Sequence, residues 1–131
     1  MRTRTWVALL FCLPAFGCAR EKSTAQLLED LKGHEERDRI VAVRLLPQRK
    51  GDAAQIVPAL IEALKDKEGD IRWSAAIGLG SFGDQAKDAI PALKAAQRDR
   101  DTRVREAAGK ALTRIDPNSA PTAGPKSPAK Q

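Results

Sequence analysis

Side chains that could carry out chemistry are few in this chain of 131 residues. His34 is the only histidine, and the two cysteines, Cys12 and Cys18, both come near the start. A single imidazole cannot form a histidine metal site or a histidine pair for acid–base catalysis. Glu35 and Glu36 fall in the same polar stretch as His34, with no sign of a pocket. We therefore expect no catalytic residue, no metal site and no cofactor, and a protein that is not an enzyme.

The first seventeen residues have the features of a secretory signal peptide. Arg2 and Arg4 precede an apolar run of about 11 residues, which extends from Trp6 to Phe16. A membrane-spanning helix needs roughly 20 apolar residues, so this run is too short to be one. Its length and its basic flank are typical of a signal peptide. We expect residues 1–17 to direct export and to be removed.

Cys18 follows the apolar run directly, after the small residue Gly17. This junction resembles the lipobox of bacterial lipoproteins, although Ala15 and Phe16 stand where that motif has leucine and a small residue. The resemblance implies that Cys18 carries a lipid, that residues 18–23 form a tether, and that the protein is held in the cell envelope, facing the periplasm or in the outer membrane. Ordinary secretory cleavage is the alternative. It would remove Cys18 or leave it as a free thiol on a secreted protein.

A period of 33 residues runs through the middle of the chain. The segment 58–66 aligns with the segment 91–99, and Leu46, Leu79 and Leu112 fall at one position of the repeat. Repeats of this length build solenoids of stacked units, and about three units are enough for stability. The three units that this period defines are residues 25–57, 58–90 and 91–116.

Each unit has the apolar spacing of two helices. Ile71, Leu79 and Phe82 lie on one stripe of a helix, because they are separated by eight and three residues. Short polar breaks with Asp, Glu and Gly separate the helices. Ser23 and Gln26 have the spacing of a capping box at the start of the first helix. The sequence therefore predicts an all-α fold over residues 24–116, an α-solenoid of three antiparallel helix pairs.

A proline, an aspartate and an arginine of unit two have counterparts at the same positions of unit three. Pro58, Asp66 and Arg72 correspond to Pro91, Asp99 and Arg105. This pattern resembles the HEAT repeat, particularly the short bacterial form known from phycobilisome lyases, which keeps these residue types at these offsets. Unit one departs from the pattern, with Ala25 in place of the proline and Gly33 in place of the aspartate. A terminal repeat is often atypical, because its outer side meets water.

The resemblance implies structural roles for the repeated charges. Asp66, Arg72, Asp99 and Arg105 are expected to form a ladder of hydrogen bonds between helices and neighbouring repeats, which fixes how the units stack. An arginine at one position of every unit suits a partly buried guanidinium whose donors have fixed acceptors. Binding of a phosphate or substrate by these arginines is the alternative.

The second helix of each unit carries a predicted partner surface. At 100° per residue, Trp73 and Ile77 project from the side opposite the apolar stripe. In a solenoid this side forms one continuous groove, apolar in the middle and charged at both ends, which is the composition of a protein-binding surface. Packing over neighbouring helix ends is the alternative role for Trp73. The side chains equivalent to Trp73 and Ile77 are Ile40 and Arg44 in unit one and Glu106 and Lys110 in unit three.

The net charge of +6 and the isoelectric point near 9.7 are values seen in nucleic-acid-binding proteins. Residues 24–116, however, hold 17 Lys and Arg against 16 Asp and Glu, a net charge of +1. The basic residues in excess lie in the two ends of the chain, so the predicted solenoid offers phosphates little net attraction. We therefore expect no nucleic-acid partner.

Together these features predict a monomeric, non-catalytic scaffold for protein–protein interaction, anchored by a lipid in the bacterial cell envelope. Residues 117–131 are rich in proline and are expected to be disordered. Two other functions stay open: a lyase or isomerase subunit related to phycobilisome lyases, and a HEAT-type nucleic-acid binder. A third is an adaptor whose open ends stack against another solenoid or against a second copy.

Overall fold

The structure is a computed structural model that describes residues 21–118. The predicted signal peptide, Cys18 and all but two residues of the predicted tail lie outside the described residues. Residues 21–118 form α-helices and short 3-10 helices, with no strand among them. None of these helices is long and apolar enough to cross a bilayer.

Six α-helices form three antiparallel pairs in this part of the chain, so the predicted all-α fold is confirmed. The first pair is joined to the second by the 3-10 helices η1 (Leu46–Gln48) and η2 (Lys50–Asp52), and the second to the third by η3 (Gly83–Ala89). The pairs are α1 (Thr24–Lys32) with α2 (Glu36–Leu45), α3 (Ala53–Ala63) with α4 (Gly69–Phe82), and α5 (Ile90–Ala96) with α6 (Thr102–Ile115).

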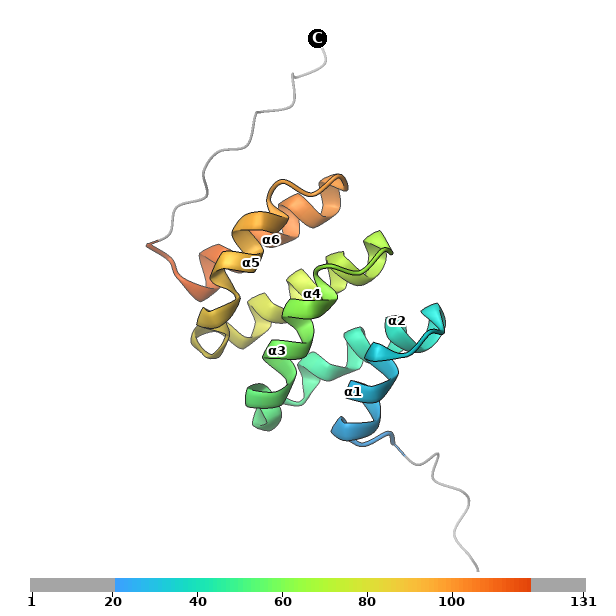
Figure 1. The fold of residues 1–131 in the computed structure, drawn as a ribbon. Helices are drawn as coiled ribbons and strands as arrows, with labels where there is room; N and C mark the ends of the chain where they lie inside the picture. Colours follow the sequence, from blue (N-terminus) through green and yellow to red (C-terminus); the bar gives the residue numbers. More distant parts are fainter. Residues whose placement is uncertain (1–20, 119–131) are drawn as a thin grey trace, which may run out of the picture.

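The pairs stack side by side in two layers (Figure 1). The first helices α1, α3 and α5 form one layer, and the second helices α2, α4 and α6 form the other. Helix α4 lies in the middle of its layer and contacts both α2 and α6. This arrangement brings residues that are 33 positions apart in sequence to equivalent places along the stack.

The starts of α1 and α6 are capped by side-chain hydrogen bonds. The Ser23 hydroxyl accepts from the backbone N–H of Gln26 at 3.3 Å, and the Gln26 side chain accepts from the backbone N–H of Ser23 at 2.9 Å, which confirms the capping box. At α6, the Asp101 carboxylate accepts from the backbone N–H of Arg103 at 2.9 Å. These bonds satisfy backbone donors that have no partner inside the helix.

Helix α3 begins five residues before the boundary that the repeat period gives. It starts at Ala53, so the division between residues 57 and 58 falls inside the helix and Pro58 lies in its interior. Proline has no N–H to donate, so α3 lacks one internal hydrogen bond there. Pro91, at the equivalent position, lies in the first turn of α5, where that donor is not needed. The period therefore aligns side chains correctly but does not mark where the helices begin.

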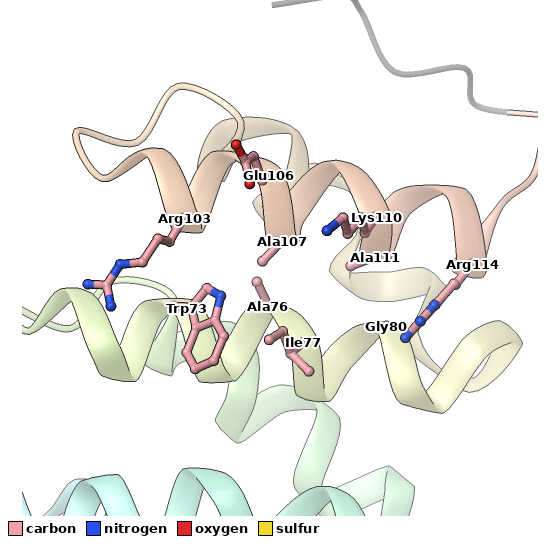
Figure 2. A pocket seen from close by; sticks show the side chains of 10 residues that line it. All are labelled: Trp73, Ala76, Ile77, Gly80, Arg103, Glu106, Ala107, Lys110, Ala111 and Arg114. Carbon is pink, nitrogen blue, oxygen red and sulfur yellow. The ribbon is translucent and has the colours of Figure 1, made fainter.

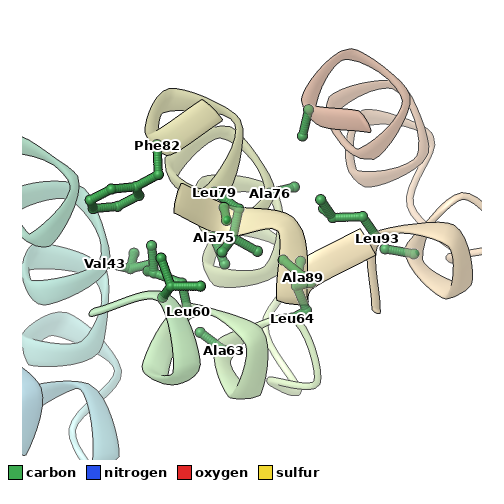
Figure 3. Close-up of a cluster of buried hydrophobic side chains, with 14 of the residues drawn as sticks. Val43, Leu60, Ala63, Leu64, Ala75, Ala76, Leu79, Phe82, Ala89 and Leu93 are labelled. Atoms are coloured by element: carbon green, nitrogen blue, oxygen red, sulfur yellow. The ribbon is translucent and has the colours of Figure 1, made fainter. Parts of the chain in front are cut away.

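A continuous hydrophobic core runs between the two layers and through all three pairs (Figure 3). Leu46, Leu79 and Leu112, which share one position of the repeat, are 0%, 0% and 2% exposed. The equivalence of these three environments confirms that the units stack in the predicted way.

Two glycines of α4 allow close contact with its neighbours, Gly78 with η1 and Gly80 with α6. A Cβ atom on Gly78 would lie 2.7 Å from Cγ of Pro47, and a Cβ atom on Gly80 would lie 2.9 Å from Cα of Ala111. The second contact is with the backbone of α6, which cannot move aside as a flexible side chain can. Small residues thus set the distance between α4 and its neighbours.

Candidate functional site

Two hollows lie on the face formed by the second helices, one on each side of Trp73 and Ile77. The first, between α2 and α4, has a volume of about 400 Å³, and Trp73, Ile77, Arg44 and Pro47 are among its lining residues. The second, between α4 and α6, has a volume of about 310 Å³ and shares Trp73 and Ile77 as lining residues (Figure 2). We call the two hollows, together with the Trp73–Ile77 ridge between them, the groove.

Five of the six residues predicted for the partner surface line the groove. Trp73 and Ile77 line both hollows, which places them at its centre. Ile40 does not line either hollow; it is half-buried and packs against the core. The other three are Arg44 in the first hollow and Glu106 and Lys110 in the second.

Trp73 and Ile77 differ in how much surface they offer. The Ile77 side chain is 42% exposed, although it is a large apolar residue. Trp73 is half-buried and packs against the core while its ring also lines both hollows. The packing role that was the alternative for Trp73 is therefore observed, and its role in binding stays a prediction. Ile77 is the more exposed of the two apolar side chains.

The second hollow contains two arginines that sequence reasoning missed, Arg103 and Arg114. Arg114 extends from α6 towards Gly80 of α4 (Figure 2). Arg103 pairs with Asp70 at 2.9 Å and with Asp101 at 2.8 Å. Hydrogen bonding to Arg103 lowers the pKa of the Asp101 carboxyl. Positions 103, 107, 110 and 114 lie on one face of a helix, so extending the helical stripe beyond Lys110 would have identified both arginines.

The charge of the groove is mainly basic. Glu106 is the only acidic residue among the residues that line the two hollows. Within residues 21–118, Arg44, Lys110 and Arg114 form no ion pair, in contrast to Arg103. An apolar centre bordered by cations without protein partners can hold an apolar side chain that is flanked by carboxylates.

Arginine–aspartate pairs connect the repeats beside the groove. Arg72 donates to Asp99 through Nε at 2.8 Å and through Nη2 at 2.9 Å, a bidentate pair in which the side chains are 7% and 12% exposed. The hydrogen bond from Arg72 holds the pKa of the Asp99 carboxyl below its ordinary value. Asp66 pairs with Arg39, whose Nε lies 2.9 Å from Oδ2. Each pair links the second helix of one repeat to the loop of the next.

The hydrogen-bond partners of the repeated arginines differ from the predicted ladder in the first and last repeats. Arg39 of unit one also belongs to the ladder, although its own unit lacks the loop aspartate. Its Nε donates to the Asp66 carboxylate of unit two. Arg72 contacts Asp66 only through the backbone carbonyl, at 2.9 Å. Arg105 has no carboxylate partner within residues 21–118 and donates instead to oxygens of its own loop and helix start. Bonds between neighbouring repeats were expected, but the partner of each arginine was not.

No group of three or more His, Cys, Asp or Glu side chains within residues 21–118 is placed to hold a metal ion. His34 and Glu35 lie in the loop that joins α1 to α2, and Glu36 is the first residue of α2. Cys12 and Cys18 lie outside the described residues. The His34 backbone carbonyl accepts a hydrogen bond from Nη1 of Arg39 at 2.8 Å. Glu35 and Glu36 are exposed.

Comparisons with known proteins agree with this geometry. A family model described as HEAT repeats matches residues 24–113. A chain from the complex of CpcE and CpcF of phycocyanin lyase from Nostoc sp. PCC7120 is similar in structure, with a TM-score of 0.67 and 25% sequence identity. The match covers 79% of this chain and 41% of that chain, so this chain spans less than half the length of the solved one. A comparison with curated proteins found no match.

Proposed function

The chain belongs to the HEAT repeat family, and on that premise we propose that it is a non-catalytic scaffold whose groove binds a segment of another protein. The observation that carries this proposal is the exposed apolar side chain of Ile77, which lies with Trp73 between two hollows. Solenoids of stacked repeats provide rigid, extended surfaces of this kind. The similar solved chain belongs to a complex of two proteins, which also favours a protein partner.

The chemistry of the groove defines the partner segment. The first hollow, lined by Pro47, Ile77 and Gly78, fits an apolar side chain. Lys110 and Arg114 lie across the second hollow and form no ion pair within the described part of the chain. Carboxylates on the partner would compensate these cations and set the orientation of the segment. The groove therefore fits an apolar residue followed by acidic residues.

Affinity capture from envelope extracts tests this function. We expect Ile77→Asp to reduce capture of the partner at least about tenfold, because a new carboxylate would occupy the apolar centre. Gln55→Asp is the matched control, since Gln55 is exposed on α3 in the other layer. Trp73→Ala should also weaken capture. If Ile77→Asp and Gln55→Asp capture the same proteins in the same amounts, the groove is not the binding surface.

We also propose that the scaffold is attached to a membrane of the cell envelope through a lipid on Cys18. Support comes from the sequence, in which Cys18 follows Gly17 and an apolar run. The capping box at Ser23 starts α1 five residues after Cys18, so residues 18–23 would be a short tether. The lipid would determine where the groove is presented, and the groove would determine which protein it binds.

Substitution of the proposed anchor gives a direct prediction. We expect Cys18→Ser to abolish incorporation of labelled fatty acid and to release the protein from the membrane fraction, because the thiol that would carry the lipid is gone. Cys12→Ser is the control, since Cys12 would leave with the signal peptide and should not change labelling. Full labelling of the Cys18→Ser variant would contradict the lipoprotein assignment.

A lyase subunit is the second candidate, favoured by the similarity to a chain of the phycocyanin lyase complex. The same capture experiment separates the two functions. A phycobiliprotein as the captured partner would favour the lyase subunit, whereas another envelope protein would favour the scaffold.

A further inference from the structure

The arginine of each repeat makes two sets of hydrogen bonds. One set holds the loop of its own repeat: Nη1 of Arg72 donates to the carbonyls of Asp66 and Lys67, at 2.9 and 3.0 Å. The other set reaches the next repeat, where Nε and Nη2 of Arg72 donate to the Asp99 carboxylate. Arg39 repeats both sets, with its own loop carbonyls and with Asp66. Each guanidinium is therefore oriented by its own repeat and presented to the next.

Arg105, in the last repeat, has only the first set complete. Its Nη1 donates to the carbonyls of Asp99 and Arg100, at 2.8 and 3.3 Å, as in the other repeats. Its Nη2 turns to the hydroxyl of Thr102 at 2.8 Å, and Nε makes no hydrogen bond within residues 21–118. A half-buried guanidinium held in this orientation, with one edge open, is prepared for a carboxylate.

The surface beside Arg105 can accept another helix. The interface between α4 and α6 places Ala76 and Gly80 of α4 in the hollow beside Ala111. One repeat later, the equivalent positions on α6 are Gly109 and Thr113, which are half-buried and exposed. Gly109 leaves room for the next second helix, whereas Thr113 carries a side chain where Gly80 has none, so the closest approach would be at Gly109.

The first repeat of this chain cannot supply the missing carboxylate. Gly33 stands at the position of Asp66 and Asp99. Each of these three residues donates its N–H to the carbonyl three residues earlier, at 3.1, 3.2 and 3.1 Å, although α1 extends to Lys32 and α3 ends two positions earlier in the period, at Ala63. A second copy stacked end to end would therefore place a glycine against Arg105, without the charge that completes the ladder.

We propose that the C-terminal end of the solenoid docks a helical repeat of another protein, whose inter-helix loop presents an aspartate to Arg105. The partner is a repeat protein with a loop aspartate at the position of Asp66 and Asp99 and with a second helix that packs on Gly109 and Thr113. Charge complementarity with the open guanidinium and the pairing seen twice within this chain define that chemistry. This docking site is separate from the groove and does not depend on what the groove binds.

A substitution at the other end of the solenoid tests this proposal, because it converts the chain into its own partner. Gly33→Asp restores the loop aspartate. Val41 and Leu45 of α2 are equivalent in the repeat to Ala107 and Ala111 of α6, which pack on α4. Val41 and Leu45 are 40% and 38% exposed, so they are apolar residues that a stacked second copy could contact. We expect Gly33→Asp to self-associate with a Kd at least about tenfold lower than that of Gly33→Asn, which has the same shape without the charge.

Sedimentation of the full chain at several concentrations, in detergent and with a reductant, provides the measurement. We expect the unsubstituted chain and Gly33→Asn to stay monomeric where Gly33→Asp associates, and Arg105→Gln in the Gly33→Asp background to return the chain to the monomer. Two results would overturn the proposal: equal behaviour of Gly33→Asp and Gly33→Asn, or association that survives Arg105→Gln. Association of the unsubstituted chain would make a second copy the occupant and would also overturn it.

Discussion

Replacement of Arg72 by alanine is expected to lower the free energy of unfolding by about 3–5 kcal/mol. The Asp99 carboxylate is only 12% exposed and takes both hydrogen bonds of the Arg72 fork, so the variant leaves a buried charge without its cation. The carbonyls of Asp66 and Lys67 lose their donor as well. Urea denaturation followed by helical circular dichroism measures this loss.

An exposed ion pair is the control for this variant. Lys65 and Glu62 lie 2.9 Å apart, with side chains that are 68% and 72% exposed. Because water already solvates both groups, Lys65→Ala should change the free energy of unfolding by less than about 1 kcal/mol. Equal losses for Arg72→Ala and Lys65→Ala would show that the ladder does not hold the repeats together.

Acid has a defined effect on the same pair. Arg72 lowers the pKa of Asp99 in the folded protein. The stabilisation that this pair gives the folded state is therefore complete above the ordinary aspartate pKa of 3.8. It is lost as the pH falls below that value, through the lowered pKa of the folded state. Asp99→Asn removes this titration, so the variant should lose less stability than the unsubstituted chain between about pH 4 and about pH 2.

Truncation of Leu79 is expected to be as damaging as loss of Arg72. Leu79 is fully buried between the helix layers, and Leu79→Ala leaves a cavity that should cost about 2–5 kcal/mol. Ile77, two residues earlier on the same helix, is 42% exposed. Ile77→Ala removes a similar volume but should cost less than Leu79→Ala, because much of Ile77 is already in contact with solvent and no closed cavity is left.

The two alanine variants together separate core from groove. We expect Leu79→Ala to lower thermal stability, and Ile77→Ala to weaken capture of the partner while the protein stays folded. Thermal unfolding and affinity capture on both variants check this. A large stability loss for Ile77→Ala would place Ile77 in the core and remove the apolar centre of the groove.

The stacking of the fold could be predicted from the sequence because the core residues repeat. Leu46, Leu79 and Leu112 share one position of the 33-residue period and are buried alike. The start of α3 could not be predicted, because Pro58 indicates a helix beginning and yet lies in the helix interior. Helix starts depend on the local connection: residues 86–89, one period after the first residues of α3, belong to the 3-10 helix η3 and not to α5.

The groove was predicted in part. Trp73 and Ile77 were placed by helical geometry alone, which needs only the sequence. Ile40 was predicted on the same face, but it packs against the core and lines neither hollow. The pairing of Arg72 with Asp99 fits the ladder between neighbouring repeats that the resemblance implied, whereas the pairing of Arg39 with Asp66 was not predicted. Contacts between repeats require the geometry of the stack.

Site-specific photo-crosslinking in living cells tests most directly whether the groove is the binding surface. A photoreactive residue at position 77 lies between the two hollows, and one at position 55 lies on α3 in the other layer. We expect a discrete adduct with another protein from position 77 and none from position 55. An adduct from position 55 alone, or from neither position, would contradict the proposed function.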